Sequence, residues 1–233
     1  MVRRLVLWDV DGTLVRAGGV ASEVFSLAVE HAVGRHPGEH GVAMSGKTDP
    51  QIALEILAGM GLEAGQDERH LPVVVERLES ELAAAVELIR RKGRVLPGVC
   101  ELLSALHDDP DVAQSVLTGN TAGNAATKLA AFDLDRWLDL EIAAYGSDDR
   151  DRRALVPIAL RRAEELRGWT LAPHDVWVVG DTPNDLRCAR AAGARCLLVG
   201  TGNVTVDELA ALGADQVLDD LADVDAVLEL LRS

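Results

Sequence analysis

The chain has 233 residues, enough to bury a sizeable core as one large domain or as one domain with a small insert. Apolar residues make up 48% of the chain and charged residues 26%, which is ordinary for a globular protein. The net charge of −15 argues against a nucleic-acid partner, because neutralising phosphates requires clustered Lys and Arg, and the one basic run, residues 90–94, is short and isolated.

Nothing in the sequence predicts secretion or a membrane partner. The cysteines Cys100, Cys188 and Cys196 are odd in number and fit neither a CxxC motif nor a zinc spacing, which indicates a reducing compartment. The apolar stretch near the N-terminus ends at Asp9, too early for a signal peptide or a transmembrane helix. We therefore expect a cytoplasmic protein, and the sequence leaves open whether it is a monomer or a homodimer.

The first predicted element is a strand at residues 5–8, which ends at the turn Asp9-Val10-Asp11-Gly12-Thr13. The strand is a continuous apolar run rather than an alternating one. Continuous apolarity is typical of a strand that is buried on both faces, as in a parallel sheet.

An all-helical insert at residues 16–95 follows this strand. Apolar residues at helical spacing predict helices over residues 20–33 and about 71–89. Between them we expect a helix with Asp49 as its N-cap and Pro50 at its first position. No strand pattern occurs in the insert.

Strands and helices alternate through the rest of the chain, which predicts a doubly wound parallel, Rossmann-like α/β sheet. We expect residues 1–15 and 96–233 to form this α/β core and residues 16–95 to form an inserted all-α cap domain. The predicted strands of the second part are 112–117, 176–179, 196–199 and 216–218, and the predicted helices are 102–106, 125–131, 155–166, 186–192 and 206–212.

Acidic side chains follow two of the predicted strands. Asp9 and Asp11 follow the first strand, and Asp181 and Asp185 follow the strand at 176–179. Because open α/β sheets bind ligands at the carboxyl ends of their strands, we expect these carboxylates to converge there. Oxygen ligands without accompanying His or Cys suit Mg²⁺ better than zinc. Each segment alone is also compatible with a plain acidic turn or helix cap.

Thr118-Gly119-Asn120 follows the strand at 112–117. A hydroxyl, a flexible backbone N–H and an amide at the start of a helix can form a neutral cradle for an oxyanion. Taken alone, the triplet is more simply interpreted as a helix cap.

Together, Asp-x-Asp-Gly-Thr, Thr-Gly-Asn and Gly-Asp-Thr-x-x-Asp closely resemble the haloacid dehalogenase-like hydrolase superfamily, and the insert resembles the cap of its phosphoglycolate phosphatases and β-phosphoglucomutases. The resemblance implies a Mg²⁺-dependent phosphatase acting on a small-molecule phosphomonoester. It implies that Asp9 is the nucleophile, forming an aspartyl-phosphate, and that Asp11 is the general acid and base. The implied Mg²⁺ ligands are Asp9, the backbone carbonyl of Asp11, Asp181 and Asp185, and the implied phosphoryl-binding residues are Thr118, Gly119 and Asn120.

The superfamily also uses a basic residue, usually lysine, shortly before the Gly-Asp motif. Residues 146–163 contain arginines but no lysine. Arg152, just before the predicted helix at 155–166, is our candidate for this catalytic and phosphate-binding role, with Arg150 and Arg153 still open. Arginine binds phosphate differently from lysine, and an exposed arginine at a helix start is the plain alternative.

Within the insert, Ser45-Gly46-Lys47-Thr48-Asp49 resembles the cap loop that reaches the active site in these relatives. The resemblance implies substrate contacts from Gly46, Lys47 and Thr48, with Lys47 meeting a carboxylate or hydroxyl. A solvated loop that only caps the next helix is the alternative.

Asp11 favours phosphate esters over halides as substrates, because the dehalogenases typically lack this second aspartate.

Two other functions are compatible with some or all of these motifs. A phosphosugar mutase of the β-phosphoglucomutase type shares every core motif and stays open. A phospho-accepting receiver module also uses Asp, Thr and Mg²⁺ on a parallel sheet, but it is shorter and has no helical insert after its first strand, so we rank it below the two enzymes.

Overall fold

The computed structural model describes residues 2–62 and 65–233; Met1 of the predicted core and residues 63–64 of the predicted cap lie outside the described residues. Six parallel strands form one sheet in the order β5-β4-β1-β6-β7-β8. The motif-bearing strands β4, β1 and β6 are therefore neighbours at its centre. The strands are β1 (Arg4–Trp8), β4 (Val112–Thr118), β5 (Ala144–Tyr145), β6 (Val176–Gly180), β7 (Arg195–Val199) and β8 (Gln216–Leu218).

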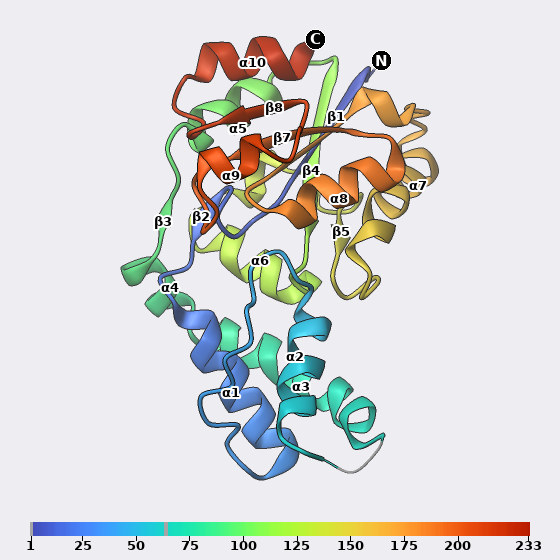
Figure 1. Cartoon of the computed structure of the whole chain (residues 1–233). Helices are drawn as coiled ribbons and strands as arrows, with labels where there is room; N and C mark the ends of the chain where they lie inside the picture. The colour runs from blue at the N-terminus through green and yellow to red at the C-terminus, as the bar shows by residue number, and fades with distance from the viewer. Residues whose placement is uncertain (1, 63–64) are drawn as a thin grey trace.

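Helices cover both faces of the sheet (Figure 1). Residues 5–8 of β1 are fully buried: Val6 and Trp8 join the apolar cluster on one face, and Leu5 and Leu7 join the cluster on the other. This two-sided burial explains why the strand reads as a continuous apolar run. One face packs against α5 (Val99–His107), α6 (Ala122–Ala130) and α10 (Val224–Arg232), and the other against α7 (Leu155–Arg167), α8 (Pro183–Ala192) and α9 (Val206–Ala210).

The predicted fold class, a doubly wound parallel α/β sheet, is confirmed. Within the core, β5 was not predicted, and of α10 only a helix start at the end of the acidic stretch 215–225 was expected. β5 has only two residues, too few for any periodicity to emerge. The segment before α10 is an acidic turn whose apolar residues are widely spaced, and the helix begins only at Val224, after the N-cap Asp223.

The helices between residues 20 and 92 lie together beyond the carboxyl edge of the sheet (Figure 1). We call residues 16–95 the cap. Its helices share an apolar cluster of their own, separate from the two clusters at the sheet. The predicted division into core and cap domains at these bounds stays a prediction. The cap helices are α1 (Val20–Val33), α2 (Asp49–Gly59), α3 (Gln66–Ala84) and α4 (Val86–Lys92).

Three expectations for the cap are wrong in detail. The two connections to the core pair as a short antiparallel ribbon, β2 (Val15–Arg16) with β3 (Arg94–Val95), where no strand was predicted. The single helix expected at 71–89 is divided at Ala85 into α3 and α4. Its apolar stripe runs through the division, so the pattern could not reveal it.

The start of α2 is the third correction. Thr48, not Asp49, is the N-cap, and its hydroxyl accepts a hydrogen bond from the backbone N–H of Gln51 at 3.3 Å. Asp49 and Pro50 are the first two helical residues. The hydroxyl of Thr48 suffices for capping, and the Asp49 carboxylate makes other contacts, described below.

Within residues 2–62 and 65–233, no helix combines the length and apolarity that crossing a bilayer requires.

Candidate active site

Asp9 and Asp11 lie at the carboxyl end of β1, where the chain enters a tight turn. The backbone N–H of Asp9 still donates to Val179 of β6 at 2.9 Å, and the Asp9 side chain is buried. Gly12 has φ +86°, and a Cβ there would collide with the carboxylate of Asp181. The glycine therefore allows the turn and lets the backbone approach Asp181. The side chain of Asp11 is 43% exposed.

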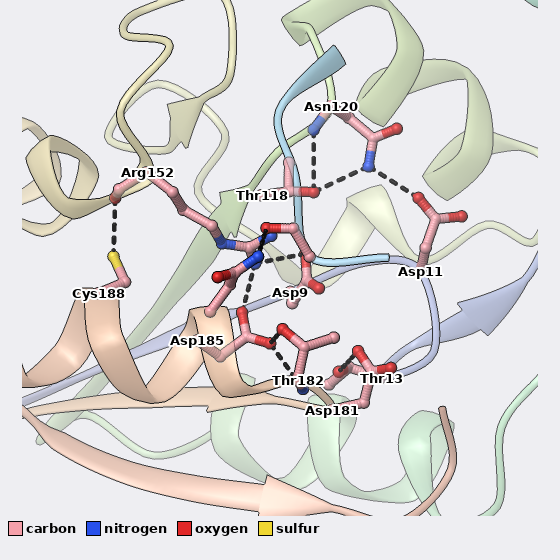
Figure 2. A network of polar contacts seen from close by, with 12 residues as sticks. Asp9, Asp11, Thr13, Thr118, Asn120, Arg152, Asp181, Thr182, Asp185 and Cys188 are labelled. Carbon is pink, nitrogen blue, oxygen red and sulfur yellow. Dashed lines mark hydrogen bonds and ion pairs between the residues drawn. The ribbon is translucent and has the colours of Figure 1, made fainter. Parts of the chain in front are cut away.

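Three buried carboxylates converge beside this turn (Figure 2). Oxygens of Asp9, Asp181 and Asp185 all lie within 4.8 Å of one another. Burial raises the pKa of Asp9, and burial together with Asp185 and Asp9 raises the pKa of Asp181. Such crowding of buried carboxylates calls for a cation.

The residues around the cluster fit Mg²⁺. The donor set is oxygen only, which suits a hard cation. Gly202 keeps space beside the cluster, because a Cβ there would collide with the Asp181 carboxylate. Asp185 is held in the first turn of α8, where its Oδ2 accepts from the backbone N–H of Thr182 at 2.9 Å and from its hydroxyl at 2.7 Å. The carboxylate of Asp11 lies outside this cluster.

Arg152 brings a cation to the same carboxylates. It begins the 3₁₀ turn Arg152–Ala154, is 8% exposed, and places Nη2 3.1 Å from Oδ1 of Asp9 and in an ion pair with Asp185 (Figure 2). The thiol of Cys188 donates to the backbone carbonyl of Arg152 at 2.9 Å, which fixes the turn. Arg150 and Arg153 instead form exposed ion pairs, so the structure brings only one of the three candidate arginines to Asp9.

Thr118, Gly119 and Asn120 lie at the end of β4, in the same cleft. The Oγ1 of the fully buried Thr118 accepts from the Asn120 backbone N–H at 3.3 Å and from its Nδ2 at 2.8 Å. The cleft has a volume of about 520 Å³. Of the predicted site residues, it is lined by Asp9, Asp11, Gly46, Lys47, Thr118, Gly119, Asn120, Arg152 and Asp181, but not by Thr48 or Asp185.

The cap loop, residues 45–49, is tied to the core at several points. Asn184 Nδ2 donates to the carbonyl of Gly46 at 2.7 Å, and the N–H of Asp49 donates to the carbonyl of Gly119 at 2.7 Å. The hydroxyl of Thr48 donates to the carbonyl of Arg150 at 3.2 Å. A Cβ on Gly119 would collide with the backbone carbonyl of Lys47, so a glycine is required for this approach.

Lys47 lines the cleft, but its ammonium already has a partner. Nζ forms an ion pair with Glu55 of α2, and this contact lowers the pKa of Glu55. The side chain is 23% exposed. Lys47 is therefore held at the cleft by a cap residue rather than lying in a fully solvated loop.

Two site residues escaped the sequence analysis. Lys128 of α6 is 4% exposed, and its Nζ lies 2.5 Å from Oδ2 of Asp11 and 2.6 Å from Oδ1 of Asn120. Burial alone would lower the pKa of Lys128, but Asp11 and Asp49 raise it above its ordinary value. As one of three lysines in the chain, in the helix directly after the Thr-Gly-Asn turn, it could have been found from the sequence.

The second is Asp49, which the sequence suggested only as a cap. Its Oδ2 accepts from the backbone N–H of Thr121 at 2.9 Å and from Nδ2 of Asn124 at 2.7 Å, both at the start of α6. Burial raises its pKa, and Lys128 and these hydrogen bonds counteract that rise. A carboxylate at the N-terminus of another helix is a long-range contact that no local pattern predicts.

Known proteins resemble the chain over nearly its whole length. Residues 3–193 match the family described as haloacid dehalogenase-like hydrolase. A phosphoglycolate phosphatase of Pseudomonas fluorescens is 27% identical over 94% of this chain and 77% of its own length, and phosphoglycolate phosphatase 1 of Pseudomonas aeruginosa is 28% identical over 95% and 78%. The crystal structure of a predicted phosphoglycolate phosphatase from Haemophilus somnus shares the fold, with a TM-score of 0.69 at 19% identity over 97% of this chain and 98% of that chain. The predicted family and its hydrolase class are thus confirmed, and the chain belongs to the haloacid dehalogenase-like hydrolase family.

Proposed function

We propose that this hydrolase uses Mg²⁺ to release phosphate from a small-molecule phosphomonoester through an aspartyl-phosphate on Asp9. The observation that carries the proposal is the position of Asp9 in one cleft, 3.1 Å from the Arg152 guanidinium and within the carboxylate cluster. A nucleophilic carboxylate, a fixed cation and an oxygen-rich metal site are the parts that phosphoryl transfer needs. The relatives named phosphoglycolate phosphatase support a small phosphate ester as substrate.

The reaction has two halves. First, a carboxylate oxygen of Asp9 attacks phosphorus, the bond from phosphorus to the ester oxygen breaks, and Asp11 gives its proton to the departing alcohol. Water then attacks phosphorus, Asp11 takes up a proton from that water, and the bond between phosphorus and Asp9 breaks. Asp9 must be ionised to attack, and the Arg152 guanidinium counteracts the rise that burial causes in its pKa.

Asp9, Asp181 and the backbone carbonyl of Asp11 would hold Mg²⁺, with Asp185 as a further or supporting ligand. When bound, Mg²⁺ supplies positive charge that offsets the carboxylates and attracts the phosphate. The chain contributes hydrogen-bond donors. Oγ1 of Thr118 accepts both of its contacts from Asn120, so its own hydrogen is available to a phosphoryl oxygen. Nε of Arg152 is buried and has no partner among the described residues, so it can donate as well.

We further propose that residues 1–15 and 96–233 form the catalytic core and that the cap, residues 16–95, closes over the cleft. The contacts of the cap loop with the core support this closure. In this arrangement Gly46 and Lys47 lie on the substrate side, and Lys47 meets a carboxylate or hydroxyl of the alcohol group. Thr48 is fully buried and binds Arg150 instead, so it positions the loop rather than contacting substrate. Closure excludes bulk water and selects the substrate by size and charge.

The test is phosphate release from a panel of small phosphate esters, with Mg²⁺ and with chelator. We expect wild-type turnover only with Mg²⁺, and a loss of about four orders of magnitude or more for Asp9→Asn. Asp225→Asn removes an exposed carboxylate from α10 and serves as the matched control. Equal release by Asp9→Asn, or release without metal, would contradict the proposal. Isomerisation of a phosphosugar without release of phosphate would favour the mutase instead.

A further inference from the structure

Lys128 is a buried cation for which the proposed mechanism has no role. Burying an ammonium is unfavourable unless it is paired and hydrogen-bonded, and its contacts are with Asp11 and Asn120. Arg152 already provides the cation beside Asp9. A second buried cation at the same cleft therefore needs its own explanation.

The spacing along α6 shows how this contact is built. Asn120, Asn124 and Lys128 are four residues apart, which places them on one face of the helix and the turn before it. Nδ2 of Asn124 donates to Asp49 of the cap. At the ends of the stripe, Asn120 and Lys128 both donate to Asp11 of the core.

Both donors converge on the same oxygen. Nζ of Lys128 lies 2.5 Å from Oδ2 of Asp11, and Nδ2 of Asn120 lies 2.8 Å from it. Oδ1 of Asp11 accepts no hydrogen bond from any residue that the structure describes. The Asp11 side chain is 43% exposed and lines the cleft, so Oδ1 is the oxygen left for a substrate.

We propose that Lys128 is a positioning residue: by holding Oδ2 of Asp11, it fixes the carboxyl rotation that presents Oδ1 to the leaving-group oxygen. The inference rests on the proposed function, because it assigns the proton transfer to Asp11. Lys128 itself exchanges no proton and contacts no substrate. Asn120 alone can also hold Oδ2, but its amide is shared with Thr118, so the ammonium supplies the second point that fixes the carboxylate.

The test compares two substrates of nearly the same shape. The leaving group of 4-nitrophenyl phosphate departs as an anion and needs little help from an acid, whereas that of phenyl phosphate depends on protonation. For Lys128→Met we expect kcat/KM to fall about 10- to 100-fold on phenyl phosphate and less than about threefold on 4-nitrophenyl phosphate. Arg161→Met, which removes an exposed charge from α7, should leave both values unchanged.

Other results would overturn the inference. An equal fall on both substrates means a general structural role, and a rise in KM alone on both means direct contact of Lys128 with phosphate. If Asp9→Asn releases phosphate from these esters as fast as wild type does, the proposed function fails and the inference with it. If wild type releases phosphate from both esters and Lys128→Met changes kcat/KM equally on the two, the inference alone fails.

A double-mutant cycle with Asp11→Asn tests whether Lys128 acts through Asp11. Lys128→Met should cost little more on phenyl phosphate in the Asp11→Asn background, because its effect is already lost. Losses that multiply would contradict the proposal. If Lys128→Met does not fold, as judged by circular dichroism, Lys128→Gln replaces it, because glutamine keeps a donor at similar reach but carries no charge. The kcat/KM of this variant must still fall more on phenyl phosphate than on 4-nitrophenyl phosphate.

Discussion

Asp9 and Asp11 are two residues apart, but they lie in different surroundings. Asp9 is buried, and its cation, Arg152, comes from the turn before α7 on one face of the sheet. Asp11 is 43% exposed, and its cation, Lys128, comes from α6, which packs on the opposite face. Each carboxylate thus has a cation delivered from its own side of the sheet.

The two surroundings also differ in how they are assembled. The Asp9 side, consisting of Asp9, Arg152, Asp181 and Asp185, is built by the core alone. The Asp11 side, consisting of Asp11, Asn120 and Lys128, is connected to the cap, because the start of α6 also donates hydrogen bonds to Asp49. The donors to Asp11, Asn120 and Lys128, are core residues as well, but the helix that carries Lys128 is itself held by Asp49 of the cap.

Among the residues around the two carboxylates, the largest expected effect comes from removing Arg152, the cation beside Asp9. Arg152→Met leaves two buried carboxylates unpaired, so we expect the free energy of unfolding to fall by about 3 to 5 kcal/mol in metal-free buffer. We also expect kcat/KM to fall by about 100- to 1000-fold with Mg²⁺ present. Urea unfolding and initial rates measure these effects. Arg153→Met, which removes an exposed charge one residue away, is the matched control. If Arg153→Met loses as much stability and kcat/KM as Arg152→Met, the role proposed for Arg152 is contradicted.

A smaller effect, dependent on pH, is expected for Asp181→Asn. Burial, Asp185 and Asp9 raise the pKa of Asp181 from 3.8 to about 8. Between pH 4 and 8 the folded protein keeps the proton of Asp181 while the unfolded chain loses it, so the metal-free protein loses stability as the pH rises. In chelator, Asp181→Asn should therefore match wild type near pH 4 and exceed its unfolding free energy by about 1 kcal/mol or more at pH 8.

Mg²⁺ sharpens this second prediction. At pH 8 the ion should stabilise wild type and affect Asp181→Asn much less, because binding to the folded state alone raises stability. Thermal unfolding with and without Mg²⁺ measures both effects. A stability difference between the two proteins that does not change with pH in chelator would refute the assignment of a raised pKa to Asp181.

The smallest effect is expected at the cap loop. Lys47→Ala removes a partly exposed ion pair with Glu55, so stability should change by less than about 1 kcal/mol. If Lys47 meets the alcohol part of the substrate, KM should rise several-fold while kcat changes little. Steady-state kinetics on the best ester of the panel checks this. A fall in kcat at constant KM would place Lys47 in the chemical step instead.

The two sides also differ in how well the sequence predicted them. Asp9 and Asp181 were expected at one edge of the sheet because buried apolar runs mark the strands, and a parallel sheet brings the strand ends together. Arg152 was chosen because the family resemblance implies a basic residue shortly before the Gly-Asp motif. Lys128 was missed because a single lysine inside a helical pattern is usually interpreted as a solvated residue. Its burial depends on Asp11, 117 positions earlier in the chain. Asp49 was predicted as an N-cap because local spacing cannot show that its carboxylate reaches another helix.

The central claim is that Asp9 becomes phosphorylated. Its most direct test is to quench the enzyme during turnover with Mg²⁺ and a substrate from the panel, reduce it with borohydride, and map the modified residue by mass spectrometry. Borohydride reduces an aspartyl-phosphate to homoserine, so we predict homoserine at position 9 in wild type and none in Asp9→Asn. Phosphate release without any modification of Asp9, or modification of another residue, would contradict the account.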